Sequence, residues 1–525
     1  MGADGPGPAA TGGPFQPSTW AERSPERVAT VTSAGELLTY RELEDRSRRL
    51  AQALRGAGLT VGDHVAVLAG NQARAHELLW GALRAGLYFT PLNTRLTAEE
   101  AAFIVSDCGA QAVLTTAACG ELAAALAPLT PSVRHRWAAG GRVPYHDSYE
   151  DFIAGWPADR LPDEQEGGAM TYSSGTTGRP KAAVHPLSSR PLGETRHVYD
   201  FFPMYPIGEG SVFLCPAPVY HAAPLSWSLA LHRIGATCVL MQRFDPRECL
   251  RLIEHHRVTH GFFVPTMFVR MLKLPEPERR AFDVSSLQRV VHAAAPCPVE
   301  VKERMLDWWG PVIDEFYAGS EGGGMTYITS AEWREHPGSV GRPRTAAVHI
   351  CDDEGRELPP GEPGVIWFSG AAPIRYHNNP ELSRSVIDDR GWVTLWDMGY
   401  VDAEGWLYLT DRRLFMIVSG GVNIYPQEVE DTLLLHPEVA DAAVFGVPNA
   451  EFGEEVKAVV QPVDMARAGA PLADELLGWC RERLAHYKCP RSVDFTAELP
   501  RGDNGKLYKR VLRDRYWQGH ASRII

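Results

Sequence analysis

The chain has 525 residues and a mass of 57.8 kDa; 44% of the residues are hydrophobic and 22% are charged. One hydrophobic core stops growing near ~250–300 residues, so several packed subdomains are expected, and this composition excludes an intrinsically disordered protein. With 52 Lys and Arg against 65 Asp and Glu, the formal charge of −13 has the wrong sign for binding a phosphate backbone. Nucleic acid is therefore excluded as the expected partner.

The cysteines and the apolar stretches indicate the compartment. Nine cysteines are an odd number, no two form a CxxC pair, and several lie in apolar runs, which predicts reduced thiols in a cytoplasmic protein. The N-terminus has neither the basic nor the apolar region of a signal peptide. The longest apolar stretch, residues 76–92, is interrupted by Arg84, so no membrane span is predicted.

From about residue 20, short β-branched runs alternate with segments of helical periodicity. Asp245 followed by Pro246 has the pattern of a helix N-cap. The alternation predicts βαβ units in stacked, largely parallel sheets, and hence an α/β fold. Strands are expected within 62–70, 88–93, 236–241, 259–265 and 289–296, and helices within 72–86, 245–256, 266–274 and 299–309.

The pattern changes in the last third of the chain. Between about 345 and 410, Gly and Pro turns separate short strands, which predicts a small antiparallel, barrel-like subdomain. The segment that follows has an α+β pattern of its own. We therefore expect a large N-terminal domain over residues 20–411 and a small C-terminal domain over residues 412–525.

Residues 170–185, MTYSSGTTGRPKAAVH, carry the clearest chemical signal. Two serines, two threonines, two glycines and a lysine occur within the nine residues from Ser173 to Lys181. Backbone N–H groups, hydroxyls and a cation at this density can enclose an anion, so the loop predicts a phosphate site. It is not a Walker A loop, because Pro180 precedes the lysine and Ala182 follows it. The stretch GTTG alone would fit a surface turn equally well.

Four other residues indicate no specific function when each is taken alone. Glu321 follows an apparent strand at 312–319, where a carboxylate can hold Mg²⁺ against ATP phosphates or lie in a solvated loop. Asp397 is either a turn residue or a partner of ribose hydroxyls. His221 lies in an apolar run and either packs in a core or contacts substrate. Lys506, among glycines and polar residues, resembles a flexible surface lysine when taken alone.

Six further blocks occur in the order typical of the acyl-adenylate-forming superfamily, and the chain resembles this family from about residue 20 to 515. The family includes acyl- and aryl-CoA synthetases, peptide-synthetase adenylation domains and firefly luciferase. The blocks are PVYHAAP (218–224), VVHAAAPCP (290–298), EFYAGSEGGG (315–324), WDMGYVDAEGWLYLTDR (396–412), SGGVNIYPQEVE (419–430) and PRGDNGKLYKR (500–510).

The resemblance implies roles for individual residues. The implied catalytic residues are Lys506, Glu321, Lys181 and His221, and Glu321 is also the implied Mg²⁺ ligand. In the family, the lysine at position 506 enters the active site and stabilises charge during adenylation. The implied ATP-binding residues are Ser173, Ser174, Gly175, Thr176, Thr177, Gly178, Ala294, Tyr317, Ala318, Gly319, Ser320, Asp397 and Arg412.

The resemblance also implies an activity. An acid is converted with ATP and Mg²⁺ to an acyl-AMP and pyrophosphate; the mobile C-terminal domain then rotates and admits CoA, whose thiol displaces AMP. The rotation withdraws Lys506 and brings in the loop at Gly420 and Gly421. The expected partner is a small carboxylate or a related anion. Whether the chain forms a homodimer is left open.

Departures from the family pattern leave other acceptors open. Leu414, followed by Phe415, stands where the hinge usually has Lys or Asp, Trp396 replaces a small residue, and Ala182 replaces a glycine. The alternatives are an enzyme that loads a carrier protein and an ATP-dependent diazotase that activates nitrite for an aromatic amine. A serine hydrolase using Ser320 and an inactive binding module are two further alternatives. The first lacks the expected glycine and Asp and His partners, and the second conflicts with the intact polar residues.

Overall fold

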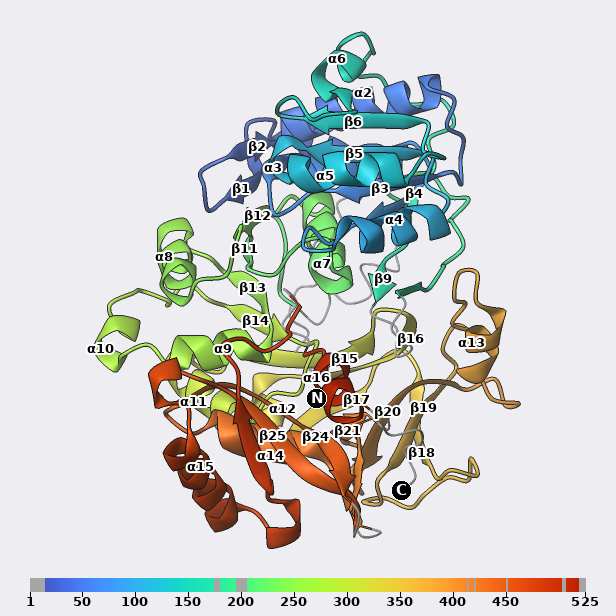
Figure 1. Ribbon diagram of the computed structural model, residues 1–525. Coiled ribbons are helices and arrows are strands. Elements are labelled where there is room, and N and C mark those ends of the chain that lie inside the picture. The colour runs from blue at the N-terminus through green and yellow to red at the C-terminus, as the bar shows by residue number, and fades with distance from the viewer. Residues whose placement is uncertain are drawn as a thin grey trace, which may run out of the picture.

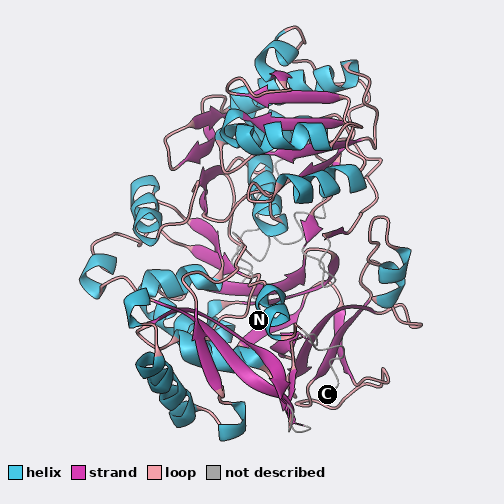
Figure 2. Ribbon diagram, in the orientation of Figure 1, coloured by secondary structure: helices cyan, strands magenta, loops and turns pink. Residues whose placement is uncertain are grey.

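The computed structural model describes residues 15–173, 180–194, 205–412, 415–419, 422–449, 452–502 and 507–518, with only the backbone of residues 411, 412, 418 and 423. Figures 1 and 2 show a helix-covered sheet at one end of the molecule, a long run of strands through its middle, and a smaller sheet with its helices at the other end.

The sheet at one end is built from the first third of the chain. Its neighbouring strands are all parallel, and every residue of its central strand β5 is buried, as expected when helices cover both faces. The strand order is β7 (Asp147–Ser148), β6 (His135–Ala139), β5 (Ala112–Thr116), β3 (His64–Leu68), β4 (Tyr88–Pro91) and β8 (Gly168–Ala169). The accompanying helices are α2 (Tyr40–Gly56), α3 (Ala73–Arg84), α4 (Ala98–Asp107), α5 (Gly120–Leu126) and α6 (Tyr149–Ala154).

The middle of the molecule contains a continuous path of 13 strands. The order is β18 (Ala347–Cys351), β19 (Gly364–Ser369), β20 (Val393–Val401), β21 (Leu407–Arg412), β17 (Ser339–Pro343), β16 (Gly322–Ile328), β15 (Ile313–Gly319), β14 (Arg289–His292), β13 (His260–Phe263), β11 (Val212–Cys215), β12 (Thr237–Leu240), β1 (Val28–Thr32) and β2 (Leu37–Thr39). From β1 to β15 the pairing is parallel, and from β15 to β18 it is antiparallel.

Helices connect the strands of this path. Asp245 caps α8 by accepting hydrogen bonds from the backbone N–H groups of Arg247 and Glu248, and Pro246 takes the first helical position, as predicted. The helices are α1 (Pro17–Arg23), α7 (Ala222–Arg233), α8 (Pro246–His256), α9 (Pro265–Leu272), α10 (Glu276–Arg279), α11 (Val299–Trp309), α12 (Ser330–Glu335) and α13 (Pro380–Ser385). A separate two-stranded ribbon pairs β9 (Tyr172–Ser173) with β10 (Lys181–Ala182).

The end of the chain forms a sheet of its own. Strand β21 ends at Arg412, and β22, the next strand, belongs to the smaller sheet. Its strands are β22 (Ile417–Ser419), β23 (Val422–Ile424), β24 (Val439–Asn449), β25 (Gly453–Pro462) and β26 (Ser492–Phe495), and its helices are α14 (Pro426–Leu434), α15 (Ala470–Arg483) and α16 (Lys509–Tyr516). Figure 1 shows these elements gathered at one end of the molecule.

The predicted α/β class and its small C-terminal α+β unit are confirmed. The strands expected between 345 and 410 are antiparallel, as predicted, and they continue the middle sheet through the pairing of β21 with β17. All nine cysteines are free thiols. Across the described ranges, no helix has the length and apolarity that crossing a bilayer requires.

Two fully buried histidines lie between the two large sheets. The indole N–H of Trp80 donates to Nδ1 of His232 (3.1 Å), while Nε2 of His232 lies 3.2 Å from the carbonyl of Ala29. An indole nitrogen can only donate, so Nδ1 is unprotonated and the ring is neutral. Burial lowers the pKa of His232 to about 4, against the small opposing effect of the Ala29 carbonyl. His76, 4.5 Å away between ring centroids, also has a lowered pKa.

This burial predicts a loss of stability in mild acid. The pKa of His232 is about 4 in the folded state and about 6.5 when unfolded. The unfolded chain therefore binds more protons between these pH values, and stability falls as the pH drops through that window, by about 3 kcal/mol in full. In thermal melts from pH 7.5 to 4.5, His232→Asn should show a weaker acid dependence than wild type, although it starts from lower stability. The exposed His255→Asn is the control; an unchanged slope in His232→Asn would contradict the prediction.

Candidate active site

A cavity of about 2200 Å³ lies where the 13-stranded path changes from parallel to antiparallel. Its walls come from the loops after β14 and β15, from the β9–β10 ribbon, and from α16 of the C-terminal part. In an α/β sheet, ligands bind outside the carboxyl ends of parallel strands, at a switch in topology.

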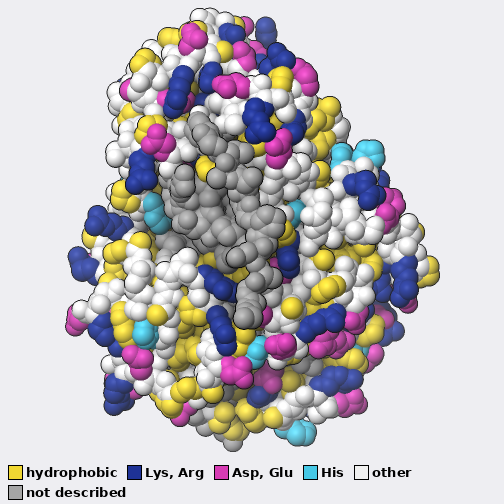
Figure 3. Space-filling model, turned by 180° about the vertical axis from the view of Figure 1, so that it is seen from behind, with side chains coloured by type: hydrophobic (Ala, Val, Ile, Leu, Met, Phe, Trp, Pro, Cys, Tyr) yellow, Lys and Arg dark blue, Asp and Glu magenta, His cyan; other side chains and the backbone are white. Residues whose placement is uncertain are grey.

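On the face seen in Figure 3, acidic and basic side chains are interspersed, so the negative net charge of the chain is not concentrated on that face.

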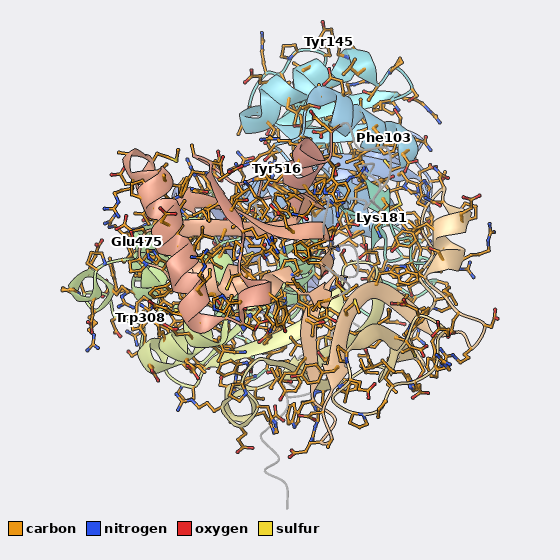
Figure 4. All side chains as sticks on the ribbon, turned by 60° about the horizontal axis from the view of Figure 1, so that its bottom comes forward. Phe103, Tyr145, Lys181, Trp308, Glu475 and Tyr516 are labelled. Atoms are coloured by element: carbon orange, nitrogen blue, oxygen red, sulfur yellow. The ribbon has the colours of Figure 1, made fainter. Side chains whose placement is uncertain are left out.

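A carboxylate, an ammonium group and two hydroxyls meet in this cavity. Nζ of Lys181 lies 3.4 Å from Oε1 of Glu321. The hydroxyl of Ser173 donates to Oε1 of Glu321 (3.0 Å), and that of Ser320 donates to Oε2 (2.9 Å). Residues 173 and 181 lie opposite each other in the ribbon, so its two strands bring the ends of the predicted phosphate loop beside the end of β15. Figure 4 shows Lys181 well inside the outline of the molecule, whereas Tyr145 lies at its edge.

The surroundings of Glu321 favour its ionised form. Burial raises the pKa of its carboxyl, but the ammonium of Lys181 and the hydrogen bonds from Ser320, the backbone and Ser173 outweigh that effect, and the pKa is lowered. The chain reverses directly after this residue, because Gly322 (φ 93°) and Gly323 (φ 96°) adopt the left-handed conformation that favours glycine. The turn therefore holds an ionised carboxylate in the wall of the cavity.

The residues predicted to bind adenosine line the same cavity. Ala294, Tyr317, Ala318, Gly319 and Ser320 all contribute to its wall. The phenol of Tyr317 donates to Oδ2 of Asp397 at 2.7 Å, and Asp397 is buried. Strand β15 and strand β20 thus bring together a hydroxyl and a carboxylate that are 80 residues apart in sequence.

Trp396, one of the departures from the family pattern, has a strained backbone conformation. Its φ of 62° lies in the left-handed region, where a bulky residue costs about 1–2 kcal/mol, and a register irregularity in the β19–β20 pairing accompanies it. The indole packs edge-to-face on Trp367, with 6.1 Å between ring centroids. Only glycine, which has no Cβ atom, would avoid this strain. Ala294, which also lines the cavity, has a comparable φ of 76°.

His221 and several aromatic rings form an apolar side of the cavity. His221 precedes α7, is half-buried, and lies edge-on to Tyr220, with 4.8 Å between ring centroids. Tyr205 and Trp227 pack edge-to-face at 4.9 Å. The lining rings beyond His221 and Tyr220 are Tyr205, Trp227, Phe262 and Phe316. This side has the character of a pocket for an apolar or aromatic group.

Some predicted site residues lie outside the described residues. They are Ser174, Gly175, Thr176, Thr177, Gly178, Leu414, Gly420, Gly421 and Lys506. For Arg412 only the backbone is described; it pairs with that of Asp397 across β20 and β21.

Phe415, which stands at the predicted hinge, lies against positive charge. Its ring is half-buried, with Nζ of Lys509 at 5.6 Å and Cζ of Arg513 at 5.8 Å from its centroid. The ammonium of Lys509 also pairs with Oε1 of Glu430 at 2.8 Å, where both side chains are buried. The ring of Phe415 thus contacts two cations of α16 in this structure.

The sequence did not predict two groups of residues at this site. The hydroxyl of Tyr376 accepts a hydrogen bond from Nζ of Lys181 at 3.0 Å, and a single tyrosine in a segment without a regular pattern gives no sequence signal for such a contact. At Glu315, which lines the cavity, Nζ of Lys302 donates to Oε2 (2.7 Å), and Nε2 of His292 lies 3.3 Å from the same oxygen. The helical pattern around Lys302 is typical of a solvated lysine, although its side chain is fully buried.

Comparison with known proteins adds to this geometry. A family model described as AMP-binding enzyme matches residues 18–375, and one described as AMP-binding enzyme C-terminal domain matches residues 428–506. A feruloyl-CoA synthase from an Amycolatopsis species is 36% identical over 499 residues, which cover 94% of this chain and 97% of the relative. The fatty acid–[acyl-carrier-protein] ligase ScoC from Streptomyces coeruleorubidus is 31% identical over 518 residues, with 96% of each chain covered.

A solved structure also resembles the whole chain. The amide bond synthetase McbA from Marinactinospora thermotolerans matches with a TM-score of 0.79 at 28% identity, covering 95% of this chain and 99% of that one. The three relatives thus share length and architecture with this chain, while their names give three different acceptors.

Proposed function

Because the chain belongs to the AMP-binding enzyme family, it is an adenylating enzyme of the acyl-CoA synthetase type, and we propose that it joins a carboxylic acid to CoA through an acyl-AMP. One observation carries this proposal most directly. Lys181, Glu321 and Ser173 meet in a cavity at the carboxyl end of a parallel strand, where nucleotide phosphates are bound in α/β folds.

The donor set at Glu321 suits Mg²⁺. An ionised carboxylate and the hydroxyl oxygens of Ser173 and Ser320 are hard oxygen ligands, which Mg²⁺ prefers. We assign Glu321 as the residue that would hold the ion together with ATP oxygens. When bound, Mg²⁺ would offset negative charge on the phosphates.

The other residues act on ATP and the acid by position and charge. A carboxylate that attacks the α-phosphorus brings two anions together, so cations and N–H donors must face the place where negative charge accumulates. Lys181 and the loop from Ser174 to Gly178 are assigned to the phosphates, and Asp397 with Tyr317 to the ribose. Lys506 is assigned to the charge that develops on the carboxylate and the α-phosphate.

The proposed reaction divides between two domains. Residues 20–411 would bind ATP and the acid, and residues 412–525 would carry Lys506 in the first step. A rotation near Phe415 would then exchange Lys506 for the loop at Gly420 and Gly421, so that the CoA thiol displaces AMP. The cation–π contacts of Lys509 and Arg513 with Phe415 would have to break during that rotation.

The acid we propose is aromatic. The apolar side of the cavity is lined by Tyr205, Trp227, Phe262 and Phe316, which suit edge-to-face or offset packing with a ring. The name of the feruloyl-CoA synthase relative points to the same class of acid. His221 would contact this substrate.

A second acceptor is also supported by the comparisons. One relative is named a carrier-protein ligase and one structural neighbour an amide synthetase, so the same acyl-AMP could pass to a carrier-protein thiol or to an amine. Nitrite in place of the acid, with an aromatic amine as acceptor, is the diazotase variant of this chemistry.

Pyrophosphate release and product analysis would separate these functions. The enzyme is incubated with ATP, Mg²⁺ and a panel of aromatic and aliphatic acids, with no acceptor, CoA, holo carrier protein or an aromatic amine; nitrite replaces the acid in one arm. A thioester formed with CoA from an aromatic acid supports the main proposal. Acyl-AMP that CoA does not consume, but that a carrier protein or an amine does, would replace it with the second.

Removing the charge of Glu321 should weaken the metal-dependent step. Glu321→Gln keeps the size of the side chain and one acceptor oxygen, but it replaces the other oxygen by an NH₂ donor and removes the negative charge, so Mg²⁺ loses its anionic ligand. The Mg²⁺ concentration for half-maximal pyrophosphate release should rise about tenfold or more, the scale for one charge-assisted contact. Glu332→Gln, on α12, is the matched control. A Glu321→Gln enzyme with the wild-type Mg²⁺ dependence would remove this residue from the metal site.

A further inference from the structure

The ammonium of Lys181 has two described partners. It lies 3.4 Å from Oε1 of Glu321 and donates a shorter hydrogen bond, 3.0 Å, to the phenol oxygen of Tyr376. The same ammonium is 4.5 Å from the centroid of the Tyr376 ring, within the range of a cation–π contact. Tyr376 is buried, and the side chains of Lys181 and Glu321 are 20% and 13% exposed, so these contacts are poorly screened by water.

Tyr376 is held firmly where it meets the lysine. Its segment pairs with the chain at the end of β10 through an isolated antiparallel bridge: the N–H of Val184 donates to the carbonyl of Arg375 (2.8 Å), and the N–H of His377 donates to that of Ala182 (2.8 Å). Beyond it, the ring of His377 lies 2.8 Å from the carbonyl of Asp107 at the end of α4.

The other strand of the ribbon is tied to the same point. The phenol of Tyr172 donates to Oδ2 of Asp107 at 2.6 Å, and the amide of Asn378 donates to the carbonyl of Asp107 at 3.1 Å. Both ends of the phosphate loop and the segment of Tyr376 are therefore fixed to one helix end. The Tyr376 hydroxyl reaches the lysine from a rigid base and not from a free loop.

We propose that Tyr376 is a positioning residue for ATP binding: it holds the ammonium of Lys181 back from Glu321, so that the carboxylate can accept Mg²⁺. Without the phenol, the ammonium keeps only the carboxylate of these two partners. The tighter ion pair would then compete with the metal for the same oxygen. The inference rests on the proposed function for the identity of the metal and of ATP.

The test measures ATP binding by titration calorimetry over a series of Mg²⁺ concentrations, with no acid or acceptor present. Tyr376→Phe keeps the ring and removes the hydroxyl; the Mg²⁺ concentration for half-maximal ATP binding should rise about tenfold, the scale for a hydrogen bond to a charged group. Tyr376→Leu removes the ring as well and should shift it further. Tyr40→Phe removes a buried phenol that donates to the carbonyl of Ala236, far from the cavity, and should leave it unchanged.

A double-mutant cycle decides whether Tyr376 acts through Lys181. In a Lys181→Met background no ammonium remains to be held, so adding Tyr376→Phe should change the Mg²⁺ midpoint less than twofold. The proposal is overturned if the shift in that background equals the shift in wild type. It is also overturned if Tyr376→Phe leaves the Mg²⁺ midpoint unchanged, or weakens ATP binding equally at every Mg²⁺ concentration.

The same experiment separates this inference from the proposed function. Wild-type protein that binds ATP with Mg²⁺ but releases no pyrophosphate with any acid would overturn the proposed function, while the comparison of Tyr376 variants would still decide the inference. Wild-type protein that binds no ATP would overturn both.

Discussion

Lys302→Met is expected to lower the free energy of unfolding by about 3–5 kcal/mol, the scale for breaking a buried ion pair by removing one partner. The ammonium of Lys302 is fully buried and donates to Glu315 at 2.7 Å, and its Nζ lies 4.8 Å from the centroid of the Trp333 ring. Methionine has a similar shape, so little packing is lost. The substitution leaves the buried carboxylate of Glu315 without its ammonium partner, and that carboxylate accounts for most of the cost.

A second substitution should restore part of the loss. Burial raises the pKa of Glu315, but His292 and Lys302 outweigh it and lower the pKa to about 2, so the group is charged at neutral pH. Lys302→Met combined with Glu315→Gln removes that charge and should be more stable than Lys302→Met alone, measured by urea unfolding at pH 7.5. Arg356→Met, which breaks an exposed pair with Asp352, is the control and should cost less than ~1 kcal/mol. Equal losses in the single and double variants would contradict the argument.

The sequence contained enough local signal for the strands and helices of the parallel region. Residues 245–256 illustrate why: the cap at Asp245, the proline after it and the apolar period all depend on near neighbours in the chain, and α8 covers Pro246–His256. The order of the motifs likewise grouped Ser173, Lys181, Glu321 and Asp397, and all four line one cavity. The motifs occupy fixed places in a shared fold, so a match of motifs also predicts where their residues lie.

The remaining features depend on contacts between distant segments. Tyr376 meets Lys181 across 195 residues, and nothing in the local pattern near either residue signals that contact. Lys302 lies on a helix whose polar residues suggest a solvated face, yet its buried partner comes from β15. The continuity of the 13 strands is a third case. It depends on the antiparallel pairing of β15 with β16, and the composition of these strands does not reveal that pairing.

The described residues on either side of residues 503–506 are anchored beside the cavity. Before this segment, the guanidinium of Arg501 pairs with Asp441 at 2.5 Å and 2.8 Å; after it, Leu507 forms a β-bridge with Arg501, and the N–H of Tyr508 donates to the carbonyl of Pro500 at 2.8 Å. Arg501, Leu507 and Tyr508 all line the cavity. The flanks of the lysine loop thus meet the same space as Glu321 and Asp397.

Lys506→Ala should therefore slow acyl-AMP formation by about 10²–10³-fold, the scale for losing one preorganised charge stabiliser. A supplied acyl-AMP should still be converted to thioester at close to the wild-type rate, because the negative charge that the lysine stabilises develops only in the first step. Both rates are measured in single turnovers, with Lys488→Ala, which breaks an ion pair to Glu428 in the same part of the chain, as the control. If both half-reactions fall equally, the lysine supports the structure of the C-terminal part instead. If neither falls, the proposed adenylation geometry is wrong, since a residue whose flanks line the cavity would then contribute nothing where the two anions meet.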